Sequence, residues 1–355
     1  MINRECGVFH ETYVADHRLF RVPLARATLA GILVLLYLVL PLLGNDYLLS
    51  VANLVSIAAV GALGLNILVG YTGQISIGHG AFMSVGAYTA ANLATRAGLP
   101  FWVCLPAGGL MAALAGLVVG IPSLRIKGLY LAIATLAGQF IIEWTINHVA
   151  WISGGVQASI QVPRPALGGF TIVSQRAMYY FMLVVATLAV VAAYNLFRTR
   201  VGRAFVAVRD QDVAAAVIGI NIFRYKLLAF AISSFYAGVT GVLYTYYLGV
   251  ANYEQFTIVT SINFLAMVII GGLGSVLGSI FGAAFITLLP ISLRYTVEGV
   301  GSLFFSVSDV LNLITNVQLV LFGGLIILFL ILEPEGLYRL YRHIRDYFRV
   351  WPFAY

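Results

Sequence analysis

Long apolar stretches separated by short polar segments run through most of the chain. A transmembrane helix needs about 20 predominantly apolar residues, whereas a membrane β-barrel would show roughly 10-residue alternating segments. The pattern therefore predicts an all-α polytopic membrane protein with about ten transmembrane helices. We place them at residues 27–43, 48–70, 76–95, 102–121, 128–147, 177–197, 227–248, 261–273, 276–293 and 316–332.

The connections between these spans are mostly short, so they leave no room for a separate soluble domain. Three are longer, at residues 148–176, 198–226 and 294–315. The predicted organisation is an N-terminal tail at residues 1–26, a transmembrane domain at residues 27–332 and a C-terminal tail at residues 333–355.

Composition agrees with a membrane protein. Apolar residues make up 61% of the 355 residues and charged residues only 9%, against roughly 25% charged residues in soluble domains. These values exclude a soluble globular protein, a disordered chain and a nucleic-acid binder. The net charge of +7 is instead what basic cytoplasmic loops of a membrane protein produce.

The distribution of Lys and Arg predicts the orientation. Cytoplasmic loops carry an excess of these residues. If the N-terminus is cytoplasmic, 16 of the 20 Lys and Arg residues fall inside, and only Arg96, Arg164, Arg176 and Arg294 fall outside. The split favours an even number of spans with both termini in the cytoplasm.

Few residues are available for enzyme chemistry or metal binding. His79, Cys104 and Glu143 lie in different predicted spans without partners at ligand spacing. Neither lysine, Lys127 nor Lys226, follows a glycine, as a phosphate-binding P-loop requires. We therefore expect no catalytic residues, no metal, no cofactor and no ATPase site in this chain.

The segment at residues 70–82 is too apolar for a solvated loop and too rich in glycine for a plain helix. Irregular backbone at membrane depth must be buried in protein or line a cavity, and broken helices often mark a transport path. A tight helical hairpin is the alternative. For His79 taken alone, a contact with a neighbouring helix is a better explanation than a proton relay. The candidate path residues are Gly73, Gln74, Ser76, Gly78 and His79.

The predicted inner loop at residues 198–226 contains a short helical pattern at residues 209–221. Asp210 or Asp212 could cap this helix, and Gly219 could end it. Val213, Val217 and Ile218 give it an apolar surface that a solvated loop does not need, so either a partner protein or the chain's own spans should cover it. The candidate coupling residues are Arg209, Asp210, Asp212, Val213, Ala214, Ala215, Ala216, Val217 and Gly219.

A third unusual feature is a run of glycines in the ninth predicted span. Gly274, Gly278 and Gly282 are four residues apart, so on a continuous helix they share one face. Small residues on one face let another helix approach closely. We predict helix packing here, either within the chain or against another subunit.

These three motifs resemble those of the permeases of branched-chain amino-acid ABC importers, of the LivM type. Residues 73–82 read Gly-Gln-Ile-Ser-Ile-Gly-His-Gly-Ala-Phe, like the family's early signature. Residues 202–230 resemble its cytoplasmic coupling segment, and residues 271–275, with Gly278 and Gly282, resemble its late glycine-rich motif. The likeness covers residues 45–335.

The resemblance implies a type II ABC importer permease fold, a location in the inner membrane of a bacterium and several partners. They are a second, LivH-type permease subunit, two cytoplasmic ABC ATPases of LivG and LivF type, a periplasmic solute-binding protein and membrane lipid. Residues 153–159 lack the acid or asparagine that the family usually carries there. The solute is therefore left open between branched-chain amino acids and the urea, amide or aromatic-acid cargo of other family members.

Two functions of other classes compete with an importer permease. A stand-alone secondary transporter would favour ionisable groups near the bilayer midplane, and we find none at the middle of the predicted spans. A membrane-embedded enzyme would need reactive side chains at one depth. Because no charged side chain at mid-span could hold an amino-acid head group, we expect the binding protein to set solute selectivity.

Overall fold

The computed structural model describes residues 23–123, 128–155, 158–167, 170–172, 174–301 and 336–350, with single positions between residues 320 and 331. The first 22 residues of the predicted N-terminal tail and most of the tenth predicted span lie outside these described residues.

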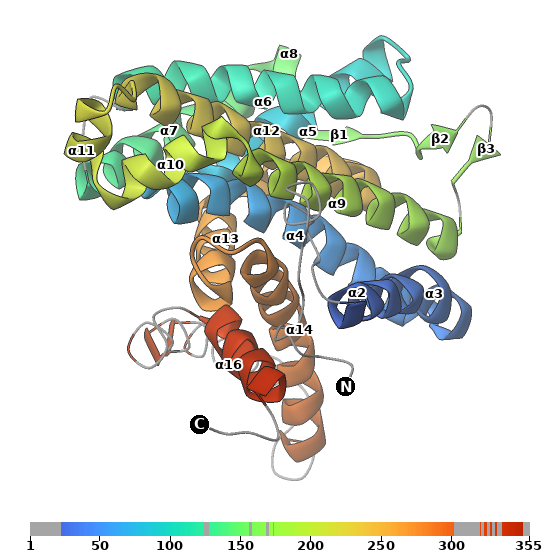
Figure 1. Ribbon diagram of the computed structural model, residues 1–355. Coiled ribbons are helices and arrows are strands. Elements are labelled where there is room, and N and C mark those ends of the chain that lie inside the picture. The colour runs from blue at the N-terminus through green and yellow to red at the C-terminus, as the bar shows by residue number, and fades with distance from the viewer. Residues whose placement is uncertain are drawn as a thin grey trace.

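The centre of the fold is the long helix α12 (Ile222–Leu248), which packs against α4 (Asp46–Thr72), α5 (His79–Arg96) and α6 (Phe101–Ser123). Figure 1 shows α4, α6, α9 (Gln175–Arg198) and α12 running side by side. In their most apolar windows α4 and α12 are 67% buried, whereas α6 and α9 are 33% buried. A helix that is apolar all round is buried inside a larger bundle, so α4 and α12 form the interior.

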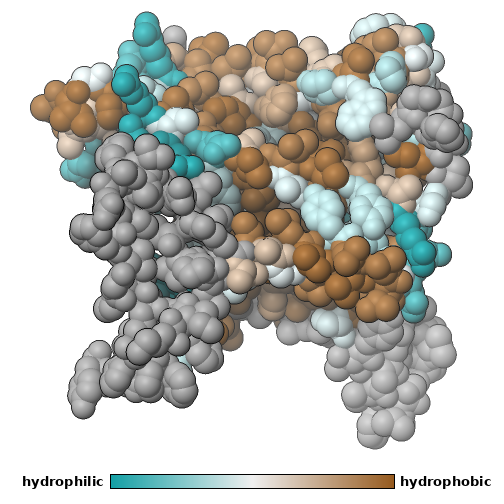
Figure 2. All heavy atoms as spheres, turned by 45° about the vertical axis from the view of Figure 1, so that its right-hand side comes forward, coloured by the Kyte–Doolittle hydropathy of each residue, from teal (hydrophilic) through white to brown (hydrophobic). Residues whose placement is uncertain are grey.

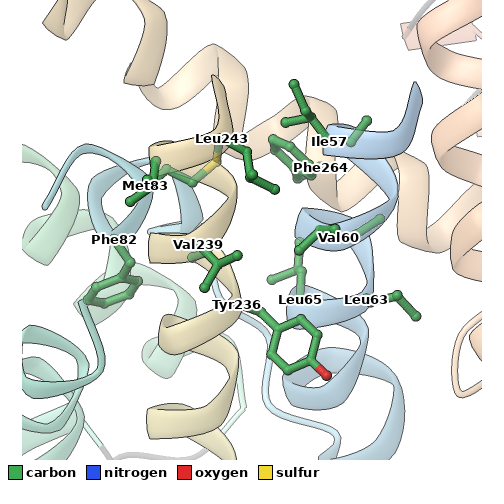
Figure 3. Close-up of a cluster of buried hydrophobic side chains, with 14 of the residues drawn as sticks. Ile57, Val60, Leu63, Leu65, Phe82, Met83, Tyr236, Val239, Leu243 and Phe264 are labelled. Atoms are coloured by element: carbon green, nitrogen blue, oxygen red, sulfur yellow. The ribbon is translucent and has the colours of Figure 1, made fainter. Parts of the chain in front are cut away.

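Small residues allow these helices to approach closely. A Cβ atom added to Gly64 would lie 2.4 Å from Cβ of Tyr236, and one added to Gly238 would lie 2.7 Å from the carbonyl oxygen of Gly108. Large side chains fill the remaining space around α12. Figure 3 shows this cluster, which includes Leu65 of α4 and Tyr236 of α12.

The other helices surround this centre. They are α2 (Pro23–Val34), the π-helical turn η1 (Leu35–Val39), α3 (Leu40–Leu43), α7 (Leu129–His148), α8 (Ala150–Ser153), α10 (Arg200–Asp210), α11 (Asp212–Val217), the 3-10 turn η2 (Tyr253–Phe256), α13 (Ile258–Gly271), α14 (Val276–Gly301) and α16 (Leu337–Val350).

Four short strands in the described part of the chain depart from the all-α prediction. β1 (Ser159–Gln161) pairs antiparallel with β4 (Val250–Asn252), and β2 (Ala166–Leu167) pairs with β3 (Phe170–Thr171). Three of them lie in the long connection predicted at residues 148–176. The β1–β4 pair satisfies backbone groups in that connection and ties it to the end of α12.

Helices coincide with the first nine predicted spans to within several residues. Five segments of the described chain are long and apolar enough to cross a membrane: α4, α6, α9, α12 and residues Tyr253–Gly271. Residues Ala27–Leu43 and Val276–Ser292 form shorter apolar helices. The chain is therefore an all-α polytopic membrane protein apart from its short strands, while the number of ten spans stays a prediction.

The outer surface of the bundle is apolar. Figure 2 shows brown side chains across the middle of one face and teal side chains toward its two sides. Val118 of α6, for example, is 72% exposed, and Leu188 of α9 is 63% exposed. An apolar belt between two polar ends suits a protein whose solvent is the lipid bilayer.

Candidate functional site

The first part of the site is the interruption between α4 and α5. Helix α4 ends at Thr72, and Gly73 adopts a left-handed conformation with φ +68° while its N–H donates to the carbonyl of Val69 over 3.2 Å. Glycine is the usual residue at such a helix end. Residues 73–78 are not helical, and α5 begins at His79. The helix break predicted from the sequence is therefore present.

The start of α5 is capped by side chains from distant helices. The N–H of Gly80 donates to Oγ of Ser261 over 2.8 Å, and the N–H of Ala81 donates to Oε1 of Gln139 over 2.7 Å. Just before the helix, the N–H of Ile77 donates to Oγ1 of Thr135 over 3.0 Å. The first N–H groups of a helix have no partner within it, so these contacts allow α5 to begin inside the protein.

Sequence reasoning missed these capping residues. Thr135 and Gln139 lie four residues apart on one face of α7, and Ser261 lies on α13. All three side chains are at most 1% exposed. The sequence did offer one signal, because Thr135 and Gln139 are polar residues at helical spacing inside an apolar span. That spacing does not show which backbone groups the two side chains bind.

Little space is left around the glycines of this segment. A Cβ atom on Gly78 would lie 2.7 Å from the carbonyl oxygen of Thr135. One on Gly80 would lie 2.9 Å from Oγ of Ser261 and from the carbonyl oxygen of Phe256. The absence of side chains at these positions is thus what allows α5 to start against α7 and α13.

The polar side chains predicted to line a path are all buried here. Gln74, Ser76 and His79 are each 2% exposed. Gln74 donates through Nε2 to Oγ1 of Thr72 over 2.9 Å, while its Oε1 and the Nε2 of His79 have no hydrogen-bond partner among the described residues. The break therefore holds hydrogen-bonding groups inside the helix bundle, next to Phe264, whose ring centroid lies 5.2 Å from that of His79.

The second part of the site is the loop that carries α10 and α11. The predicted helix at residues 209–221 is wrong in its bounds, because Arg209 and Asp210 end α10, and α11 covers only Asp212–Val217. Neither aspartate is the N-cap. Gln211 takes that position with extended backbone, at φ −157° and ψ 98°, and Asp212 follows as the first helical residue.

Helix α11 has one buried and one exposed side. Ala215 is 2% exposed, whereas Val213, Val217 and Ile218 are 65%, 83% and 74% exposed. Ala214 and Ala216 are also exposed. Ala215 therefore packs inside the chain and is not part of an external surface, contrary to the prediction. We call the exposed apolar surface of this segment the α11 surface; it is formed by Val213, Val217 and Ile218.

The end of α11 lets the chain turn back toward α12. Gly219 has φ +88°, and its N–H donates to the carbonyl of Ala216 over 3.0 Å. Nothing lies within 4 Å of the place where its Cβ would be. Glycine is thus required here for backbone conformation rather than for close contact.

Arg209 joins α10 to the end of α4. Its Nη1 donates to the carbonyl oxygen of Gly70 over 2.9 Å, and its Nη2 lies 2.9 Å from Oδ1 of Asp210. A cation at the C-terminal end of a helix is favoured by the unpaired carbonyls and by the helix dipole. Arg209 thus points back into the protein and binds Gly70, which lies three residues before the break begins at Gly73.

A turn from the late glycine motif completes this junction. The N–H of Gly274 donates to Oδ1 of Asn66 over 2.9 Å, and Nδ2 of Asn66 donates to the carbonyl of Ser275 over 2.8 Å. A Cβ atom on Gly274 would lie 2.9 Å from Nη1 of Arg209. Asn66, which sequence reasoning missed, therefore ties α4 to the turn between α13 and α14. We call the place where α10, α4 and this turn meet the junction, and it consists of Arg209, Gly70, Asn66 and Gly274.

The predicted glycine face is only partly a helix face. Gly274 precedes α14 and has φ +75°, so it belongs to the turn. Gly278 and Gly282 do lie on α14. Cβ atoms there would lie 2.7 Å from the carbonyl oxygen of Gly271 and 1.8 Å from that of Met267. Both glycines pack against α13 within the chain.

Comparison with known proteins identifies the family. Residues 47–330 match the model of the family described as branched-chain amino acid transport system / permease component. The chain belongs to this permease family. It is 33% identical to the high-affinity branched-chain amino acid transport permease LivM of Escherichia coli over 310 residues, which is 81% of this chain and 69% of LivM.

More distant relatives include the autoinducer 2 import permease LsrC of Enterobacter sp., 26% identical over 52% of each chain. LivH of Methanocaldococcus jannaschii, a probable branched-chain amino acid permease, is 26% identical over 62% of this chain and 72% of its own. No solved structure matches the chain significantly.

Family membership sets the general function of the permease. It is a membrane permease subunit of an ABC importer, and it works in a complex with other subunits. It is a multi-pass protein of the bacterial inner membrane. Among the described residues, no three His, Cys, Asp or Glu side chains gather where they could hold a metal ion.

Proposed function

We propose that the permease moves branched-chain amino acids, or a related small polar solute, into the cytoplasm by alternating access. The proposal rests on the 33% identity to LivM, whose name assigns it this class of solute. Ten spans and two cytoplasmic termini are part of the proposal. So is the division into a tail at residues 1–26, a permease domain at residues 27–332 and a tail at residues 333–355.

The partners that we propose supply what this chain lacks. Two cytoplasmic ATPases of LivG and LivF type would drive the cycle, a LivH-type subunit would form the other half of the path, and a periplasmic binding protein would deliver the solute. This chain would catalyse no covalent step. In an alternating-access cycle, ATP binding shifts the population of conformations with opposite openings.

The break at residues 73–78 is the proposed path-lining segment. Its support is the buried polar groups of Gln74 and His79 that have no partner among the described residues. Such groups suit an uncharged or zwitterionic solute in transit, because they form hydrogen bonds without fixing a net charge. Selectivity would then lie mainly in the binding protein.

The α11 surface is the proposed contact with an ATPase. Three apolar side chains exposed to water at the end of a membrane protein are costly unless a partner covers them, since each gains about 1.5–3 kcal/mol on full burial. The junction would carry the movement of α11 into the membrane, because Arg209 lies three residues before α11 and binds the carbonyl of Gly70 next to the break.

One experiment tests the function as a whole. The permease is expressed with the candidate ATPases, second permease and binding protein, and uptake of radiolabelled leucine, urea and an aromatic acid is measured in membrane vesicles. We expect leucine uptake that requires both ATP and the binding protein. Uptake of urea or the aromatic acid alone would overturn the solute, and uptake by the permease without ATPases would overturn the importer mechanism in favour of a secondary transporter.

A further inference from the structure

The C-terminal helix α16 is strongly amphipathic. At about 100° per residue in an α-helix, Leu340, Ile344 and Tyr347 fall on one side. Arg339, Arg342 and Arg345 fall outside that stripe. Leu340, Ile344 and Tyr347 are 54%, 50% and 62% exposed. The sequence predicted only a cytoplasmic tail at residues 333–355, and the helix is new from the structure.

The start of α16 is fixed to the transmembrane helices. A Cβ atom on Gly336 would lie 2.7 Å from the backbone nitrogen of Gly272, so this residue packs directly on the turn between α13 and α14. Leu337 packs against the hydrophobic core, and the ring of Tyr341 lies 5.7 Å from that of Phe281 on α14. Figure 1 shows α16 beside α14. With these contacts made, the stripe of Leu340, Ile344 and Tyr347 faces outward.

The position of α16 along the bundle follows from that same turn. The turn binds the end of α4 through Asn66, and Arg209 of the basic inner loop reaches the same place. By the positive-inside rule this end faces the cytoplasm. Helix α16 therefore begins at the cytoplasmic boundary of the membrane, an inference that rests on the orientation in the proposed function.

The charge on α16 is predominantly positive. The helix carries Arg339, Arg342, Arg345 and Arg349 and a single acid, Asp346, which pairs with Arg345 over 3.1 Å. The cytoplasmic leaflet of a membrane is negatively charged where it contains anionic lipids, and it attracts basic segments. An apolar stripe flanked by arginines is the pattern of a helix that lies in the membrane interface.

We propose that α16 lies in the plane of the cytoplasmic membrane surface and binds anionic phospholipids. Leu340, Ile344 and Tyr347 would enter the boundary between headgroups and acyl chains, and Arg342 and Arg345 would contact lipid phosphates. Because Gly336 and Leu337 hold the start of α16 on the turn between α13 and α14, a lipid-bound α16 would also hold that turn, and with it the junction.

The test measures where the stripe lies in the full-length permease. In a Cys6→Ser background, which leaves the buried Cys104, Ile344→Cys is labelled with a nitroxide. The protein is reconstituted in vesicles of phosphatidylcholine, or of phosphatidylcholine with phosphatidylglycerol at three to one. Collision with oxygen reports lipid contact, and collision with a water-soluble nickel chelate reports water. Asp346→Cys, which at about 100° per residue lies about 160° around the helix from residue 344, is the matched control.

We expect the label at residue 344 to collide with oxygen and not with nickel in vesicles that contain phosphatidylglycerol, while the label at residue 346 remains accessible to nickel. Replacing Arg342 and Arg345 with Gln should lower the ratio of lipid-facing to water-exposed label about fivefold per arginine. Raising the salt concentration should also lower this ratio, because salt screens the attraction between the arginines and the anionic lipids.

Three outcomes would overturn the proposal. The first is equal access of nickel to residues 344 and 346 in both kinds of vesicle. The second is shielding of residue 344 that does not depend on phosphatidylglycerol. The third is shielding that appears only after the ATPases are added, which would make the stripe a protein contact. None of these results depends on uptake, so failure here is distinguishable from failure of the proposed transport function.

Discussion

At the scale of single residues, glycine and asparagine determine how the break between α4 and α5 is held. Gly78 and Gly80 allow backbone and capping groups to approach α5. Asn66 binds two backbone groups of the turn between α13 and α14 and the hydroxyl of Ser279 on α14. An unpaired buried polar group costs about 1–3 kcal/mol. These positions therefore tolerate little change even though they carry no charge.

We predict that Gly80→Leu abolishes uptake while the protein still inserts in the membrane. The new Cβ would lie 2.9 Å from Oγ of Ser261, so the cap on the N–H of Gly80 could not form. Overpacking costs about 1–3 kcal/mol, which shifts the start of α5 without unfolding the bundle. Uptake is measured per amount of protein in the membrane fraction.

Gly31→Leu is the matched control, because Gly31 lies in α2 and has nothing within 4 Å of its would-be Cβ. It should leave uptake unchanged. Normal uptake by Gly80→Leu would mean that the break is only a connection between two spans.

A second prediction at this scale concerns Arg209. Arg209→Gln removes the charged hydrogen bond to Gly70, and such bonds contribute about 1.5–3 kcal/mol. We expect the ATPases to copurify as before, while uptake per ATP hydrolysed falls by roughly tenfold or more. The two quantities are measured on the same reconstituted sample.

Arg203→Gln serves as the control, since its exposed guanidinium donates to the carbonyl of Arg198 within the same loop, over 3.2 Å. It should change neither quantity. If Arg209→Gln instead released the ATPases, Arg209 would be a docking residue and the junction would not transmit movement.

At the scale of elements, the two sides of α11 separate folding from partner binding. Ala215 is buried against the rest of the chain, and the α11 surface is exposed. A substitution at Ala215 would therefore disturb the fold itself. Only the exposed side chains test docking cleanly, because exposed substitutions usually change stability by about 0.5 kcal/mol or less.

We predict that replacing Val213, Val217 and Ile218 together with Ser releases the ATPases and abolishes uptake. Each buried apolar side chain contributes about 1.5–3 kcal/mol, so the loss should exceed a hundredfold in affinity, since 1.4 kcal/mol corresponds to a factor of ten. Copurification of the ATPases is the measurement, and the melting temperature of the purified permease should stay the same. Retained ATPases with full uptake would exclude α11 as the docking helix.

At the scale of the whole molecule, the polar ends and the apolar middle define the orientation. Sixteen of 20 Lys and Arg residues fall on one side if both termini are cytoplasmic, and this bias sets the topology of helical membrane proteins. The junction, the α11 surface and the start of α16 would then all lie at the cytoplasmic end. Binding of an ATPase to α11 and binding of lipid to α16 would therefore both act on the turn between α13 and α14.

We predict that a reporter enzyme that is active only in the periplasm is inactive when it is fused after Tyr355. The same reporter fused after Arg164, in the outer connection, should be active. Activity at the C-terminal fusion would refute the even number of spans.

The sequence by itself predicted the helices that coincide with the first nine spans, the position where the chain is interrupted and the loop that is basic. These features are local, since apolar runs, glycine-rich segments and charge can be read within about 20 residues. It also predicted an exposed apolar element near residue 213, although not its bounds. Asp210 and Asp212 were wrong as caps, because Gln211 adopts the extended N-cap conformation between two helices.

Only the tertiary structure decided what these segments bind. The capping contacts of α5 join residues 58 and 181 positions apart, and Asn66 reaches a turn 208 residues away. It likewise decided that Ala215 faces inward and Val217 outward, and that Gly278 and Gly282 pack on α13 of the same chain. The physical reason is that a polar group or a small residue in an apolar helix has many available partners, and only the packing of the helices selects one.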